Sequence, residues 1–216
     1  MSATSPKIRL PSGLEIGYSS TLASFPEDVE LAGGTHYLLA RNGRGKTTLL
    51  RTIAGTLKPR GGGVSPEGYL QYLPEDLRFD PEITAATIFR MLLPRHRIAA
   101  ATELARNIEL DTRKPYGRLS TGNRRKTSLI VAEFSTREDA VNILLLDEPF
   151  SGLDAFARAA FEEIWKKSAG NVLRLVSCHP DYDSMAMGSA LLIESGRITH
   201  HQSSDQTWDS LKQLLN

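Results

Sequence analysis

A short glycine-rich segment carries the strongest chemical signal in this chain. It reads A-R-N-G-R-G-K-T-T over residues 40–48, between an apolar run and a helical pattern. Glycines let the backbone turn its N–H groups inward, and the start of the following helix carries about half a positive charge, so the segment can cradle phosphates. Lys46 is placed to reach the β and γ phosphates, and the Thr47 hydroxyl to ligate Mg²⁺. We predict an ATP site whose loop residues are Arg41, Asn42, Gly43, Arg44, Gly45, Lys46, Thr47 and Thr48.

Two adjacent carboxylates follow a second apolar run later in the chain. Residues 142–146 read N-I-L-L-L, and Asp147 and Glu148 come directly after them. A carboxylate at the tip of a buried strand can hold Mg²⁺ beside bound phosphates, and this is the role predicted for Asp147. Glu148 can act as the general base that poises an attacking water, a contribution of about 10² to 10⁴ in rate. The two acids therefore indicate hydrolysis as well as binding.

Charge and length exclude several classes of protein. With 26 basic and 25 acidic side chains the net charge is +1, so the chain lacks the broad basic field that a dedicated nucleic-acid binder uses. Its 216 residues suffice for one buried domain and are too few for two complete nucleotide-binding halves. No apolar run approaches the roughly 20 residues of a membrane span, and the N-terminus has no apolar signal core. We expect a cytoplasmic protein, with Cys178 as a packed thiol.

The elements that must position these residues alternate between strands and helices. Three short β-like runs at residues 7–10, 14–18 and 35–39, separated by Pro and Gly, predict a small antiparallel cap. A helix is expected from Lys46 to about Ala54. Residues 82–118 have helical spacing with a break at Pro94, and strands alternate with helices again from Val141 onward. This order predicts a single α/β domain over residues 1–216, with residues 82–118 as an inserted helical subdomain.

Three further segments carry a resemblance to a known family. Residues 119–123 read L-S-T-G-N and resemble the LSGGQ signature of the ATP-binding cassette (ABC) family, residues 151–154 read S-G-L-D and resemble its D-loop, and His179 resembles its switch histidine. They occur in the family's order, and the resemblance covers nearly the whole chain. It implies an α/β fold with a P-loop NTPase (RecA-like) core, an N-terminal antiparallel β subdomain and a short inserted helical subdomain.

The resemblance also implies that two copies assemble head to tail. In such a dimer, ATP on the Lys46 loop of one subunit is covered by the partner's signature segment, through the hydroxyl of Ser120 and the N–H of Gly122. His179 would bind the γ phosphate and hold the attacking water together with Glu148. Tyr18 is the candidate for stacking on adenine, with ordinary strand packing as the alternative.

Four positions depart from the family pattern. Ala40 and Thr121 replace glycines, and Asn123 replaces glutamine in the signature. Glu75 stands where the family has glutamine, so a neutral ligand of Mg²⁺ and water becomes an anion beside a polyanion, and the metal must offset that repulsion. Thr47, Asp147 and Glu75 are therefore the predicted metal ligands. These changes suggest that the isolated chain hydrolyses ATP weakly, and a high basal rate in the purified protein would refute this.

The favoured function is the ATP-binding, ATP-hydrolysing subunit that powers an ABC transporter, with ATP and Mg²⁺ as cofactors. Its partners would be a separately encoded transmembrane subunit and a second ATP-binding subunit, expected to be an identical copy, and it would lie on the cytoplasmic face of the membrane through that partner. The compact plan resembles exporter-type subunits. Two alternatives stay open: a soluble ABC ATPase for repair or cofactor assembly, and a nucleotide sensor with little turnover. The candidate contacts with the membrane subunit, if exposed, are Phe89, Met91, Leu92 and Leu93.

Overall fold

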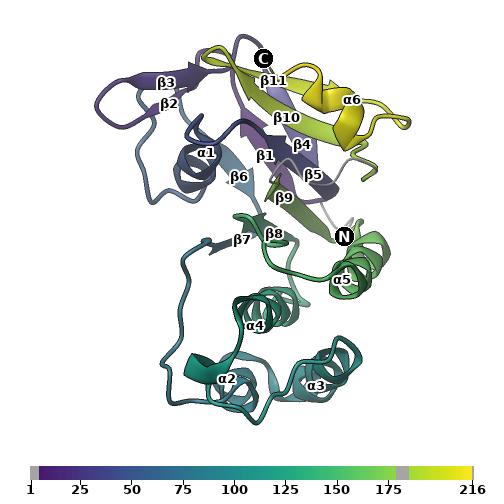
Figure 1. The fold of residues 1–216 in the computed structure, drawn as a ribbon. Helices are drawn as coiled ribbons and strands as arrows, with labels where there is room; N and C mark the ends of the chain where they lie inside the picture. Colours follow the sequence, from purple (N-terminus) through teal and green to yellow (C-terminus); the bar gives the residue numbers. More distant parts are fainter. Residues whose placement is uncertain (1–4, 179–184, 216) are drawn as a thin grey trace.

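The structure is a computed structural model that describes residues 5–178 and 185–215. An eight-stranded mixed sheet of order β2-β3-β11-β10-β5-β9-β8-β7 runs through the molecule (Figure 1). Within it, the five adjacent strands β10, β5, β9, β8 and β7 run parallel to one another, while β11 and β10 form an antiparallel hairpin. In chain order the strands are β2 (Glu15–Gly17), β3 (Thr21–Ser24), β5 (Gly34–Leu39), β7 (Tyr69–Leu73), β8 (Asn142–Leu146), β9 (Val172–Cys178), β10 (Ser189–Glu194) and β11 (Arg197–Gln202).

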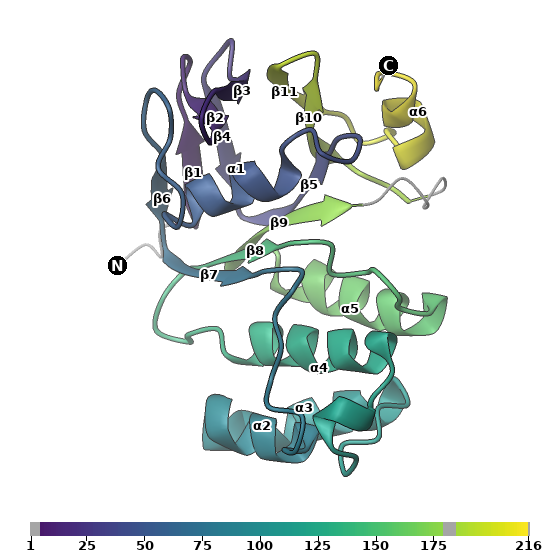
Figure 2. The same ribbon diagram turned by 60° about the vertical axis from the view of Figure 1, so that its left-hand side comes forward.

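Both faces of the central strands are covered, as near-continuous apolar runs in parallel strands predict. Along β8, Ile143 and Leu145 pack toward helix α1 (Lys46–Ile53), and Leu144 and Leu146 pack into the core on the opposite face. Figure 2 shows α1 on one face and helices α4 (Thr121–Phe134) and α5 (Ala155–Ser168) on the other. The short helix α6 (Trp208–Lys212) buries Trp208 and Leu211 in this second core.

A second, three-stranded antiparallel sheet of order β4-β1-β6 covers α1. It consists of β1 (Lys7–Leu10), β4 (Val29–Ala32) and β6 (Ser65–Glu67), so the predicted N-terminal antiparallel β subdomain is confirmed. The run at residues 35–39, which sequence grouped with this cap, instead lies in the large sheet, parallel to β9 and β10. Tyr37, Leu38 and Leu39 are all buried, and β5 has a parallel strand on each side. This burial on both faces is typical of a central strand of a parallel sheet.

The segment between β7 and α4 is helical, as its periodicity predicts. It contains α2 (Ala85–Leu92), the 3₁₀ turns η1 (Arg95–Arg97) and η2 (Tyr116–Arg118), and α3 (Ile98–Asn107). The Thr84 side chain caps α2 by accepting from the Thr87 N–H, and α2 ends just before Pro94. Helices α2 and α3 pack on α4, on its side away from the sheet (Figures 1 and 2).

A buried ion pair joins α4 to the central sheet. Arg174 on β9 and Glu133 on α4 are 1% and 3% exposed, with 2.6 Å between Arg174 Nη2 and Glu133 Oε2. Arg174 Nε donates to Glu133 Oε1 at 3.0 Å, and the Trp165 indole N–H donates to the same oxygen at 2.7 Å. This bidentate pair holds the helix that begins with the signature-like segment against the sheet that carries the phosphate loop.

We expect Arg174→Leu to lower the free energy of unfolding by about 3–5 kcal/mol, because it leaves the buried Glu133 carboxylate without its cation. Urea unfolding followed by circular dichroism measures the change. The double variant Arg174→Leu/Glu133→Leu is the matched control and should be more stable than the single variant, since both charges are then gone. A single variant as stable as the wild type would contradict a stabilising role for the pair.

Candidate functional site

The phosphate-binding loop joins the end of β5 to the start of α1, as predicted. Gly43 and Gly45 have φ angles of 74° and 111°, a region that side chains disfavour. A Cβ on Gly45 would lie 2.9 Å from Cδ2 of Leu22. The loop therefore needs glycine at residue 45 for its backbone conformation, whereas the exposed Leu22 side chain could move aside for a Cβ.

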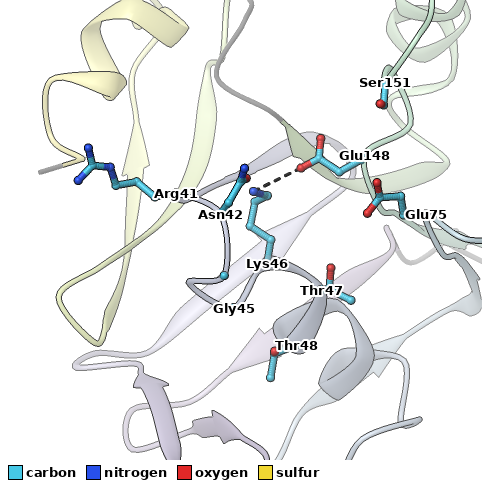
Figure 3. Close-up of a pocket in the computed structure, with 10 residues that line it drawn as sticks. Arg41, Asn42, Gly45, Lys46, Thr47, Thr48, Glu75, Glu148 and Ser151 are labelled. Atoms are coloured by element: carbon cyan, nitrogen blue, oxygen red, sulfur yellow. Dashed lines mark ion pairs between the residues drawn. The ribbon is translucent and has the colours of Figure 1, made fainter.

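A pocket of about 470 Å³ opens beside this loop and α1 (Figure 3). It brings together loop residues and acids from distant parts of the chain, as expected where ligands bind at the carboxyl ends of parallel strands. Arg44 and Asp147 are outside its lining, although both neighbour residues that belong to it. The lining residues are Arg41, Asn42, Gly43, Gly45, Lys46, Thr47, Thr48, Glu75, Glu148 and Ser151.

Lys46 and Glu148 meet inside the pocket. Lys46 Nζ lies 3.3 Å from Glu148 Oε1, and their side chains are 9% and 12% exposed (Figure 3). The same ammonium donates to the carbonyl oxygen of Ala40 at 3.2 Å. The lysine predicted to bind phosphate and the acid predicted as the general base are thus in direct contact at this pocket.

Asp147 is held at both carboxylate oxygens. The Tyr72 hydroxyl donates to Oδ2 at 3.3 Å, and the Ser177 hydroxyl donates to Oδ1 at 2.7 Å. Burial, together with the negative charge of Asp147, raises the pKa of Tyr72 to about 12, so the phenol keeps its proton at neutral pH. Sequence reasoning missed Tyr72 and Ser177, because neither lies in a motif and both act through contacts across the sheet.

The predicted metal ligands offer oxygen donors only. Thr47 and Glu75 line the pocket, and Asp147 immediately precedes Glu148. Over residues 5–178 and 185–215, no group of three or more His, Cys, Asp or Glu side chains could hold a metal alone. Mg²⁺ is usually held by one or two carboxylates and the substrate's phosphates rather than by a complete protein cage, so this donor set fits it.

Arg125 is a further residue at this site that sequence reasoning missed. From α4, its Nη2 donates to the backbone carbonyl oxygen of Glu75 at 2.9 Å. Burial lowers the pKa of Arg125, and the nearby Glu75 and Asp147 carboxylates oppose that effect by favouring the charged guanidinium. A cation of the protein therefore lies beside Glu75 and offsets part of the repulsion that this carboxylate would exert on phosphates. The sequence signal that could have indicated this role is the position of Arg125 just after the signature-like segment at residues 119–123.

The signature-like segment lies apart from the pocket of its own chain. Ser120 caps α4 by accepting from the Asn123 N–H at 3.3 Å. A Cβ on Gly122 would come within 2.4 Å of the Gly152 carbonyl oxygen, so the signature and D-loop segments pack tightly together. Asp154 caps α5 through the Ala157 N–H, and its Oδ2 lies 2.8 Å from Lys126 Nζ. Neither Ser120 nor Gly122 belongs to the described lining of the pocket.

Three residues discussed from the sequence, Tyr18, Cys178 and His179, are not part of the described pocket lining. Tyr18 is 56% exposed and outside the pocket lining, and Arg51 Nη1 donates to its hydroxyl at 3.4 Å. Cys178 is buried at the end of β9, as predicted for a packed thiol, and burial raises its pKa. His179 lies outside the described residues.

Comparisons with known proteins agree on one family. A family model described as "ABC transporter" matches residues 30–151. The chain is 33% identical over 135 residues to the ABC transporter ATP-binding protein YtrB of Bacillus subtilis (strain 168), covering 56% of this chain and 45% of that protein. It is 29% identical over 174 residues to the uncharacterized ABC transporter ATP-binding protein MJ1023 of Methanocaldococcus jannaschii, covering 76% and 65%. The chain thus spans about half to two thirds of the length of these relatives.

A solved structure described as the ATP-binding subunit of an ABC transporter has the same fold. Its TM-score with this chain is 0.74 at 21% sequence identity, and the match covers 96% of this chain and 98% of that one. The predicted fold class, an α/β P-loop NTPase core with an antiparallel β subdomain, is therefore confirmed.

Proposed function

This chain belongs to the ABC transporter family, and from that premise we propose that it is the ATP-hydrolysing subunit that powers a transporter. The observation that carries the proposal is the pocket in which Lys46 and Glu148 lie 3.3 Å apart, beside the glycine-rich loop. A pocket that only bound nucleotide would need the lysine and the loop. A carboxylate facing that lysine adds the group that hydrolysis requires.

In this proposal each residue has a separate task. The loop N–H groups and Lys46 bind the phosphates, and Glu148 accepts the proton of the water that attacks the γ phosphorus. Mg²⁺, bound by Thr47, Asp147 and Glu75, would neutralise charge that develops on the phosphates. Tyr18 remains our candidate for the adenine, since its exposed ring leaves a face open for stacking.

We further propose that two copies complete each other's sites. The position of Ser120 and Gly122 outside the pocket of their own chain supports this, because the signature-like segment is then available to a neighbour. The positive N-terminal end of α4 would face the γ phosphate of the partner's ATP. Residues 1–216 would act as one nucleotide-binding domain, with residues 82–118 as its inserted helical subdomain, on the cytoplasmic face of a membrane and with no nucleic-acid partner.

A membrane-embedded subunit is the second proposed partner. No helix in the described part of the chain is long and apolar enough to cross a bilayer. Of the four apolar candidates on the helical segment, Phe89 and Leu93 are buried and stabilise the core instead, because they face α3 and α4. Met91 and Leu92 are 70% and 48% exposed at the end of α2. This pair is the proposed contact surface.

We expect the tagged protein to purify from detergent-solubilised membranes, in Mg²⁺ and ATP, with a stoichiometric subunit that has several membrane spans. The variant Met91→Asp/Leu92→Asp should lose that subunit and keep its ATP affinity, because charge at an apolar contact is costly to bury. Leu214→Asp is the matched control, since Leu214 is also exposed, at 47%, but follows α6, which lies at the opposite end of the molecule from α2 (Figure 1).

Mass spectrometry of the purified complex provides the measurement. A wholly soluble complex would instead favour a soluble ABC ATPase and leave the ATP-site assignments standing. If the double aspartate variant retained the membrane subunit, Met91 and Leu92 would not form the contact surface with that subunit.

A further inference from the structure

Ser177 is a buried hydroxyl at the centre of the site. It lies on β9, the strand between β5, which feeds the phosphate loop, and β8, which ends in the two acids. Ser177 is fully buried and pairs in register with Leu38 of β5. No motif of the sequence singled it out, and it is not among the residues that line the pocket.

One hydroxyl makes a hydrogen bond to each acid. Ser177 Oγ donates its proton to Asp147 Oδ1 at 2.7 Å and accepts the backbone N–H of Glu148 at 2.7 Å. A serine hydroxyl has a single donor, so the direction of both bonds is determined: the proton points to Asp147, and a lone pair receives Glu148. The bonds fix the side chain of one acid and the backbone of the other.

The backbone of Glu148 needs such a restraint. Its φ angle is 47°, in the left-handed region that residues with a side chain rarely adopt. A strained residue of this kind persists only where its surroundings hold it in place. Because the direction of the Glu148 side chain follows its backbone, the bond to Ser177 also sets where the carboxylate points relative to Lys46.

We propose that Ser177 is a positioning residue that holds Asp147 for the metal and Glu148 for the attacking water at the same time. This inference rests on the proposed function, which assigns those two roles. Tyr72 supports only one of them, since its hydroxyl reaches Asp147 and not Glu148. Loss of Ser177 should therefore affect both metal binding and the position of Glu148, whereas loss of the Tyr72 hydroxyl should act through Asp147 alone.

The test compares ATP affinity with Mg²⁺ and with EDTA, by fluorescence of a labelled nucleotide, and measures kcat separately. For Ser177→Ala we expect the Mg²⁺-dependent gain in affinity to fall by about 10-fold, the lower end for residues that orient metal ligands. Affinity in EDTA should stay as in the wild type, and kcat at saturating Mg²⁺ should fall as well. Tyr72→Phe should reduce the Mg²⁺-dependent gain as well, but should lower kcat at saturating Mg²⁺ less than Ser177→Ala does, because the bond between Ser177 and Glu148 remains.

Ser189→Ala is the matched control. Ser189 is also a buried serine on a core strand with two side-chain hydrogen bonds, but its partners are His36 and His200 rather than the acids. It should leave both the Mg²⁺-dependent gain and kcat unchanged. Ser177→Thr, which keeps the hydroxyl, should restore part of what Ser177→Ala loses, and thermal melting of each variant identifies any general loss of folding.

Two results would overturn the inference in distinguishable ways. If Ser177→Ala shows the wild-type Mg²⁺-dependent gain and the wild-type kcat, Ser177 has no positioning role and the proposed function stands. If the wild type itself gains no affinity from Mg²⁺, the proposed function fails and this inference fails with it. Mn²⁺ binding in the presence of ATP, followed by electron paramagnetic resonance, gives a readout that does not depend on turnover.

Discussion

Replacing Glu148 with glutamine is expected to lower ATP hydrolysis by about 10²- to 10⁴-fold, the usual contribution of a positioned general base. The amide keeps nearly the same shape and its oxygen can still accept hydrogen bonds, but it cannot take a proton from water. ATP binding should survive, because the loop and Lys46 are intact. In the proposed dimer, ATP would hold the two copies together and hydrolysis would let them separate, so the variant should accumulate as an ATP-bound dimer.

Phosphate release measures the rate, and size-exclusion chromatography in Mg²⁺ and ATP measures the dimer. Glu75→Gln is the matched control, because it makes the same change at another carboxylate that lines the same pocket. It should retain hydrolysis, since an amide oxygen can still serve as a ligand. Turnover by Glu148→Gln at the wild-type rate would show that Glu148 is not the base.

Lys46→Ala should abolish productive ATP binding. The Lys46 ammonium is almost fully buried, so its charge acts in a poorly screened site where it interacts strongly with phosphate oxygens. Removing it also takes away the cation that lies 3.3 Å from Glu148, so that this carboxylate repels the incoming triphosphate more strongly. Both effects weaken binding, and we expect no measurable hydrolysis.

Isothermal titration calorimetry with ATP in Mg²⁺ measures this loss. Lys58→Ala is the matched control, because Lys58 is an exposed lysine after α1 that does not line the pocket, and its removal should leave affinity unchanged. Wild-type affinity in the Lys46→Ala protein would refute the assignment of the loop.

The parts of the site that sequence predicted are those built from contiguous residues. The loop at residues 41–48 and the acids 147 and 148 each follow an apolar strand, and both strands form as expected, because a short apolar run bounded by polar turn residues has few other ways to bury itself. The break of the helical segment at Pro94 was equally predictable, since proline cannot continue a helix.

Contacts that depend on register across the sheet could not be predicted. Ser177 reaches the acids only because β9 lies between β5 and β8, and Arg125 reaches Glu75 only because α4 packs beneath β7. The short strands β3, β4 and β6 were missed for a related reason, because their pairing partners rather than their own residues stabilise them. The roles assigned to Tyr18, Ser120, Gly122 and His179 stay predictions.

The ion pair between Lys46 and Glu148 links two roles of the proposed site. In that proposal, the oxygens of a bound terminal phosphate and the Glu148 carboxylate would attract the same ammonium, because both are anions. Phosphate binding would therefore weaken the 3.3 Å contact and change the direction of the Glu148 side chain. Binding of the substrate and orientation of the base would then be coupled through one shared cation.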